Sequence, residues 1–129
     1  MPLNPNAQKW VDALRSGKYQ QAQSQLSITQ TEWNEEKMKY ESNGQISYCC
    51  LGVLCEVAVQ EGVIPSYDKV ACYPPSEVTN WVGLNTHQGK YILDGEERYL
   101  AETDNDRDRK SFTTIADIIE SQPAGLFKE

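Results

Sequence analysis

The sequence predicts an α+β fold: a single small domain, residues 1–129, with about four helices and one or two short antiparallel β-hairpins. The length is the first observation behind this prediction, because a chain of this size can bury a core without cross-links and is short for two domains. The second is a helical spacing of apolar side chains in four stretches. The third is a pair of dipeptides, Asn43-Gly44 and Asp94-Gly95, that favour tight hairpin turns.

The first predicted helix spans about residues 5–16. Asn4 is a favourable N-cap, and Pro5 suits the first helical position. Gly17 provides a natural end. The apolar spacing i, i+3, i+4, i+7 predicts a buried face made of Ala7, Trp10, Val11 and Leu14.

Residues 18–35 are polar and rich in glutamine, so we expect an irregular segment with a short strand near residues 25–29. The next stretch alternates around Asn43-Gly44, and both of these residues tolerate the positive φ angles of a type I′ turn. The pattern predicts a β-hairpin within residues 37–48.

The second predicted helix, residues 49–62, is the centre of the expected core. Its apolar face is wider than that of an ordinary amphipathic helix, which predicts burial on most sides. Gly62 and Pro65 end it, and a loop with a short strand at 70–72 follows. The residues of the wide face are Leu51, Val53, Leu54, Cys55, Val57 and Ala58.

A third, short helix begins at Pro75-Ser76 and ends at Gly83, with Val78, Trp81 and Val82 facing inward. Residues 90–100 are predicted to form a second hairpin around Asp94-Gly95.

We expect residues 102–110 to be a charged loop. The final helix begins at the N-cap Ser111 and ends before Gln122-Pro123. Its expected buried side comprises Phe112, Ile115, Ile118 and Ile119.

The charge and the chain start restrict the functional classes. Twelve basic against nineteen acidic residues give a net charge of -7, which disfavours general nucleic-acid binding. No apolar run approaches the roughly 20 residues that cross a bilayer, and the first residues do not resemble a signal peptide. We therefore expect a cytoplasmic protein without a membrane partner.

Four cysteines, Cys49, Cys50, Cys55 and Cys72, are expected to be reduced thiols in that compartment. The favoured interpretation is small, buried side chains; a zinc site and a reactive thiol are alternatives. We expect no metal and no cofactor.

Asp104, Asp106 and Asp108 match the first three ligand positions of a calcium loop. The match then fails, because Arg109 replaces the required glycine and Ile115 replaces the bidentate glutamate. A solvated loop is the favoured interpretation. The single histidine, His87, is likewise expected to be solvated.

Several polar residues lie where packing does not explain them. Arg15 and Lys18 complement the dipole at a helix C-terminus, and this structural role is the simpler interpretation. The functional alternative is that they hold an anion or nucleotide, with Tyr19 stacking on it. The candidate ligand-binding residues are Arg15, Lys18, Tyr19, Gln21, Asn105 and Asp106.

Four collinear blocks of the chain resemble a family of small uncharacterised phage and prophage proteins. They are WVDALRSGKYQQ (10–21), YCCLGVLCE (48–56), PSEVTNWVGL (75–84), and Asn105-Asp106 ahead of SFTTIADIIE (111–120). The resemblance implies a viral context but no mechanism. The chain departs from the family pattern at Ala22 and at residues 108–110, where glycine or a small residue is usual.

The favoured function is a non-enzymatic phage accessory protein that binds a host protein or a small ligand in the infected cell. The sequence contains no phosphate-binding loop, no dinucleotide motif and no recognisable nucleophile–base spacing, so binding is favoured over catalysis. Two alternatives stay open: a nucleotide-binding protein or small enzyme with a polar pocket, and a virion or assembly component. Trp33, in a polar segment, is a candidate exposed anchor.

Overall fold

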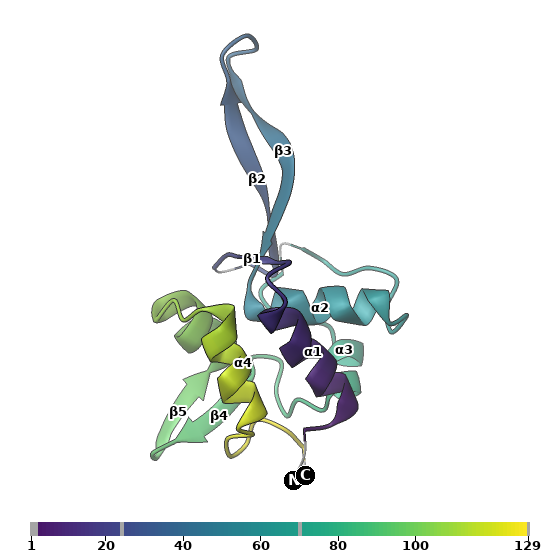
Figure 1. The fold of residues 1–129 in the computed structure, drawn as a ribbon, viewed down its shortest axis with the longest axis vertical. Coiled ribbons are helices and arrows are strands. Elements are labelled where there is room, and N and C mark those ends of the chain that lie inside the picture. Colours follow the sequence, from purple (N-terminus) through teal and green to yellow (C-terminus); the bar gives the residue numbers. More distant parts are fainter. Residues whose placement is uncertain (1–2, 24, 70, 129) are drawn as a thin grey trace.

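The computed structural model describes residues 3–23, 25–69 and 71–128 and confirms a small α+β domain. Within these residues, four α-helices and one π-helix accompany a three-stranded mixed sheet and a two-stranded antiparallel sheet. Figure 1 shows a helical body from which one hairpin projects. The helices are α1 (Pro5–Arg15), α2 (Cys50–Gln60), α3 (Ser76–Val82), the π-helix η1 (Leu100–Arg107) and α4 (Phe112–Glu120). The strands are β1 (Gln20–Gln21), β2 (Ser27–Asn34), β3 (Lys39–Tyr48), β4 (Lys90–Leu93) and β5 (Glu96–Tyr99).

Helix α1 forms as the sequence predicts. The Asn4 side chain accepts a hydrogen bond from the Ala7 amide at 2.8 Å, and Gly17, with φ of 77°, leads the chain away. The Trp10 indole donates to the Cys50 carbonyl at 3.0 Å, so α1 is docked on the first turn of α2.

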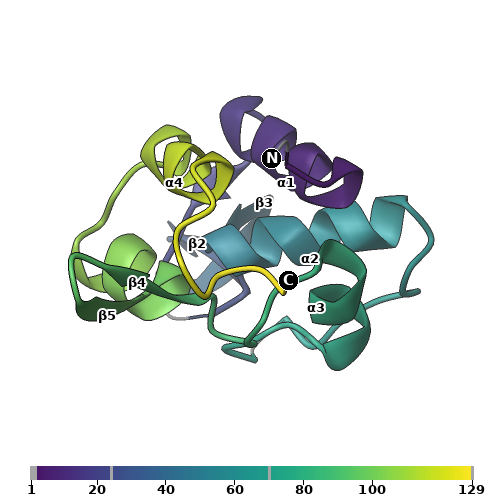
Figure 2. The same ribbon diagram turned by 90° about the horizontal axis from the view of Figure 1, so that it is seen from below.

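Helix α2 is the centre of the core, as predicted, and crosses the molecule between α1 and α3 (Figure 2). Its N-cap is Cys49, whose sulfur accepts a hydrogen bond from the Gly52 amide at 3.4 Å. Gly52 itself lies against the Leu26 backbone with no space for a Cβ. The buried residues of this helix are Cys50, Leu51, Gly52, Val53, Leu54, Cys55, Val57 and Ala58.

The two remaining α-helices also match their predicted bounds within a few residues. Helix α3 ends at Gly83, with φ of 83°. The Ser111 hydroxyl caps α4 by accepting from the Thr114 amide at 3.2 Å. Ile118 is only partly buried, but the other predicted core residues of α4, Phe112, Ile115 and Ile119, are buried.

The position of the first hairpin was predicted wrongly. Strands β2 and β3 are joined at residues 35–38, where the Asn34 side chain accepts a hydrogen bond from the Lys37 amide at 3.2 Å. Asn43-Gly44 lies inside β3, where the register shifts between the pairs Thr29↔Ile46 and Thr31↔Ser42. A glycine suits such a bulge as well as a turn, and the dipeptide alone does not distinguish them.

The strand predicted at 25–29 begins at Ser27 and continues to Asn34, so the hairpin is longer than expected. Of the strand predicted at 70–72, Val70 lies outside the described residues, and Ala71 and Cys72 belong to no strand. The carbonyl groups of Lys69 and Ala71 instead accept hydrogen bonds from the amides of Ser27 and Leu26, respectively.

The second hairpin is confirmed, with Asp94 and Gly95 both at positive φ, 52° and 80°. The segment after it is where the sequence was misinterpreted: the expected loop at 102–110 is largely the π-helix η1. Glu102 has its partner in Tyr73, and Asp104 has partners in β4 and β5, and no local pattern reveals these contacts. Among the described residues, none of the helices combines the length and the apolarity required to cross a bilayer.

Candidate functional site

The π-helix η1 organises the candidate site. It begins at Leu100, which is fully buried, and the Leu100 carbonyl accepts a hydrogen bond from the Cys50 thiol across a sulfur–oxygen distance of 3.6 Å. The wide turn is closed by the Asp108 amide, which donates to the Thr103 carbonyl at 2.8 Å. π-Helical turns are rare and are frequent at functional sites, so the side chains they direct are the natural candidates.

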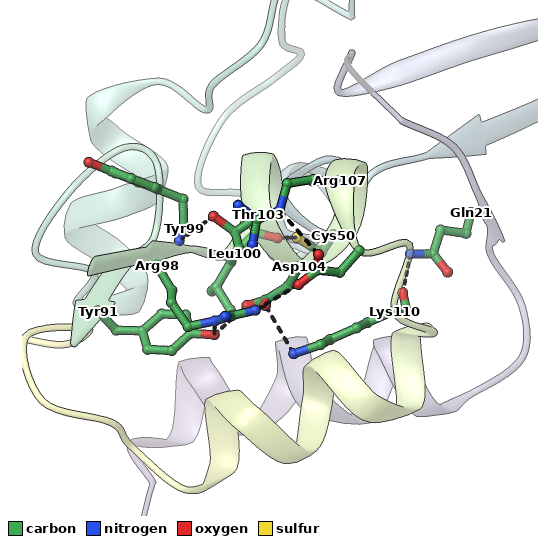
Figure 3. Close-up of polar contacts among 11 residues, drawn as sticks. Gln21, Cys50, Tyr91, Arg98, Tyr99, Leu100, Thr103, Asp104, Arg107 and Lys110 are labelled. Carbon is green, nitrogen blue, oxygen red and sulfur yellow. Dashed lines mark hydrogen bonds and ion pairs between the residues drawn. The ribbon is translucent and has the colours of Figure 1, made fainter. Parts of the chain in front are cut away.

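Asp104 is the most buried charged residue of η1, with no exposed surface. Its Oδ1 accepts a hydrogen bond from Arg98 Nη2 at 2.9 Å and lies 3.3 Å from Lys110 Nζ, and its Oδ2 accepts from the Tyr91 hydroxyl (Figure 3). Burial, together with the bond to Asp104, raises the pKa of Tyr91 to about 12. A buried carboxylate needs such partners, and this cluster holds η1 against β4 and β5.

Asn105 follows Asp104 and is also fully buried. Its side-chain oxygen accepts from Gln21 Nε2 at 2.8 Å, and its nitrogen donates to the Ala22 carbonyl at 2.8 Å and to Asp106 Oδ1 at 2.9 Å. Gln21 Nε2 also donates to the Lys110 carbonyl at 2.6 Å, a contact visible in Figure 3. The structure thus brings together three of the six predicted site residues, Gln21, Asn105 and Asp106.

Asp106 opens onto a pocket of about 170 Å³. Two acidic residues, Asp106 and Glu102, are among those that line it, and the Tyr73 hydroxyl donates a hydrogen bond to the Glu102 carboxylate. None of its lining residues carries a positive charge. The lining residues are Cys49, Cys72, Tyr73, Ala101, Glu102 and Asp106.

A broader hollow of about 630 Å³ adjoins this acidic pocket, because Tyr73 lines both. Its walls combine the proline rings of residues 74 and 75 with the polar side chains of residues 85–88. His87, expected to be solvated, is exposed and lies on this wall. Tyr73 is thus shared by an acidic pocket and a hollow with a mixed apolar and polar lining.

The other three predicted site residues lie elsewhere. Arg15 forms ion pairs with Asp117 at 2.6 Å and Glu120 at 2.7 Å, which join α1 to α4 and raise the pKa of its guanidinium. The Tyr19 ring packs edge-on against Tyr48, with 5.3 Å between centroids. Lys18 is exposed beyond the end of α1. None of the three lines the acidic pocket.

Sequence reasoning missed Tyr73, Glu102 and the contribution of the cysteines to this pocket. Residues 63–75 have no periodic pattern, and Glu102 was one charge among several in an expected loop. The only available signal was an aromatic residue directly before Pro74-Pro75, which is too common to identify a site.

All four cysteines are free thiols, but the prediction that they are buried is wrong for Cys72, which is exposed. Burial raises the pKa of Cys49 to about 11 and that of Cys55 to about 12, and it holds the pKa of Cys50 well above its usual value. These three thiols are therefore protonated near neutral pH and are poor nucleophiles. Within the described segments, no three His, Cys, Asp or Glu side chains are placed to hold a metal ion.

We expect Ellman's reagent to modify Cys72 rapidly in the native protein and the other three cysteines only after unfolding. The physical reason is access, together with the low thiolate fraction of the buried residues. The absorbance released before and after denaturant addition measures this, and Cys72→Ser should abolish the fast phase. Any thiol that still reacts rapidly in that variant would contradict the assignment.

Comparison with known protein families identifies one family that matches the chain. The model of a family described as "Domain of unknown function (DUF8296)" matches residues 5–123. The searches of the curated proteins and of the solved structures each found no match.

Proposed function

The chain belongs to the DUF8296 family, and we propose that it is a non-enzymatic phage accessory protein whose acidic pocket binds a cationic group of a host protein or small ligand. The viral context rests on the four sequence blocks that resemble phage and prophage proteins. The binding function rests on the pocket beside η1.

The observation that carries the proposal is the pairing of two carboxylates with an aromatic residue in one small pocket. Asp106 and Glu102 supply negative charge, and Tyr73 supplies a ring that attracts a cation. The residues that line the pocket include no lysine and no arginine. A volume of about 170 Å³ is enough for a guanidinium or ammonium head but not for a nucleotide.

The hollow beyond Tyr73 favours a basic side chain of a peptide over a free small cation. The prolines at 74 and 75 and the exposed His87 line about 630 Å³ of further space, which a free ammonium ion would leave empty. Neighbouring residues of a bound peptide would fill it. A host protein is therefore favoured over a small ligand as the partner.

The residues behind the pocket support binding by fixing Asp106. Asn105 donates to its carboxylate at 2.9 Å and is itself held by Gln21 and the Ala22 carbonyl. A carboxylate that is already positioned loses less conformational freedom when a ligand arrives. The net charge of -7 adds long-range attraction for a basic partner.

The nucleotide-binding alternative is less favoured. A phosphate at Arg15 would have to displace the carboxylates of Asp117 and Glu120, which already hold the two terminal guanidinium nitrogens, Nη2 and Nη1. A phosphate in the acidic pocket would meet Asp106 and Glu102. Both contacts oppose an anionic ligand.

We expect N-acetyl-arginine amide, used as a probe, to bind the wild-type protein in the millimolar range, and Asp106→Asn to weaken binding about tenfold or more. The reason is that a hydrogen bond to a charged group contributes roughly 1.5–3 kcal/mol. Isothermal titration calorimetry measures both affinities.

The matched control is Asp94→Asn, which removes the same charge at an exposed turn where positive φ suits asparagine. It should bind the probe like the wild type. Equal losses in the two variants would mean that only net charge matters, and unchanged affinity in Asp106→Asn would refute the pocket as the binding site.

A further inference from the structure

The β2–β3 hairpin projects from the helical body as a ribbon that no helix covers (Figure 1). Strand β1 pairs with β3 only at Ser47 and Tyr48, so the ribbon beyond them has two strands. At roughly 3.3 Å per residue, eight residues of β2 extend about 25 Å. A two-stranded ribbon is marginally stable by itself in water, and a partner that covers part of it would stabilise it.

The end of this hairpin carries two large exposed apolar side chains. Trp33 is 48% exposed and Met38 is 73% exposed. The core of the protein does not require them there, since the buried cluster lies within the helical body and contains neither. Tryptophan is the residue type most enriched in binding hot spots, and methionine adapts to irregular pockets.

The charges at the same end are unevenly matched. Glu41 lies 3.1 Å from Lys37 Nζ and 4.0 Å from Lys39 Nζ, so both lysines share one carboxylate. Glu35 and Glu36, in the turn, are exposed and form no ion pair with any described residue. At this end Glu35, Glu36 and Glu41 outnumber Lys37 and Lys39, so the surface beside Trp33 and Met38 carries a small net negative charge.

Two hydrogen bonds of Asn34 stabilise the turn. The Asn34 side chain accepts from the Lys37 amide at 3.2 Å and donates to Glu41 Oε2 at 2.9 Å. Met38 has a φ of 52°, in the left-handed region. A fixed turn costs less conformational entropy on binding than a mobile one.

We propose that the tip of the β2–β3 hairpin, residues 33–38, is a docking surface for a partner protein that offers an apolar pocket with a basic rim. Trp33 and Met38 enter the pocket, and Glu35 and Glu36 face the rim. A second copy of the chain fits less well, because each copy carries a net charge of -7 and the turn itself is acidic. This surface is separate from the acidic pocket, so its test does not depend on the function proposed above.

The experiment places a photoreactive benzoylphenylalanine at Met38 in the full chain and cross-links it in the cells in which the protein is naturally made. The cross-linked protein is identified by mass spectrometry, purified, and titrated against the unmodified chain at low and high salt. We expect one heterologous partner whose affinity falls with salt and drops about tenfold or more in Trp33→Ala. Glu35→Lys/Glu36→Lys should weaken binding comparably.

Each control variant makes a comparable change at a position outside the hairpin. Leu93→Ala removes an apolar side chain with the same 48% exposure, and Glu77→Lys/Glu96→Lys reverses two exposed charges on the body. Both should bind like the wild type. A cross-link to a second copy of the chain, no cross-link at all, or a partner whose affinity ignores Trp33 and the two glutamates would each overturn the proposal.

Discussion

Replacing Gly52 with alanine should destabilise the protein more than the same replacement at any other glycine whose surroundings the structure describes. A Cβ at this position would lie 1.8 Å from the Leu26 carbonyl oxygen and 2.7 Å from its carbon. Both atoms belong to the backbone of a fully buried residue, so the strain cannot be relieved by a side-chain rotation. The expected loss is more than about 4 kcal/mol, the range of exceptional substitutions.

Helix propensity alone would predict the opposite, a gain in stability. Gly52 lies inside α2, and alanine in an exposed helix would stabilise by about 1 kcal/mol. Gly62→Ala is the matched control, since its φ of 76° strains an alanine but no atom lies within 4 Å of the new Cβ. It should cost about 1–2 kcal/mol. Urea unfolding followed by circular dichroism measures both, and a smaller loss for Gly52→Ala would contradict the close approach of α2 to Leu26.

The second large effect is expected at Asp104. Asp104→Ala leaves Arg98, which is largely buried, and the Tyr91 hydroxyl without their buried acceptor. Removal of one member of a buried charge cluster typically costs about 3–5 kcal/mol. Arg98 also contacts Asp108 at 2.8 Å, which offsets part of the loss.

Asp108→Ala is the control for this second prediction. It removes the other carboxylate of Arg98, but the Asp108 side chain is 32% exposed and water screens the pair. We expect a clearly smaller loss than for Asp104→Ala, because a solvent-screened ion pair contributes little to stability. Equal midpoints of urea unfolding for the two variants would contradict the assignment of Asp104 as the anchor of η1.

The helices were predictable because their signals are local. Asn4 and Ser111 cap α1 and α4 within three residues, and the Asp94-Gly95 turn depends only on its own backbone angles. The first hairpin was misplaced because Asn43-Gly44 suits a bulge as well as a turn. Which of the two forms depends on pairing along the whole ribbon.

The π-helix could not be predicted, because its polar side chains find their partners in other elements of the fold. Asp104 depends on Tyr91 and Arg98, and Asn105 depends on Gln21, more than 80 positions away. For the site, sequence reasoning selected Gln21, Asn105 and Asp106, which the fold brings together. It missed Tyr73, because an aperiodic loop does not reveal which pocket its side chains line.

The most direct test of the acidic pocket is an amide-resolved NMR titration of the ¹⁵N-labelled chain with N-acetyl-arginine amide. The account predicts saturable shifts at Tyr73, Ala101, Glu102 and Asp106, absent with N-acetyl-alanine amide and strongly reduced in Asp106→Asn. Shifts that saturate around Asp117 and Glu120 instead, or no saturable shift at the pocket, would contradict the central claim that this pocket binds a cation.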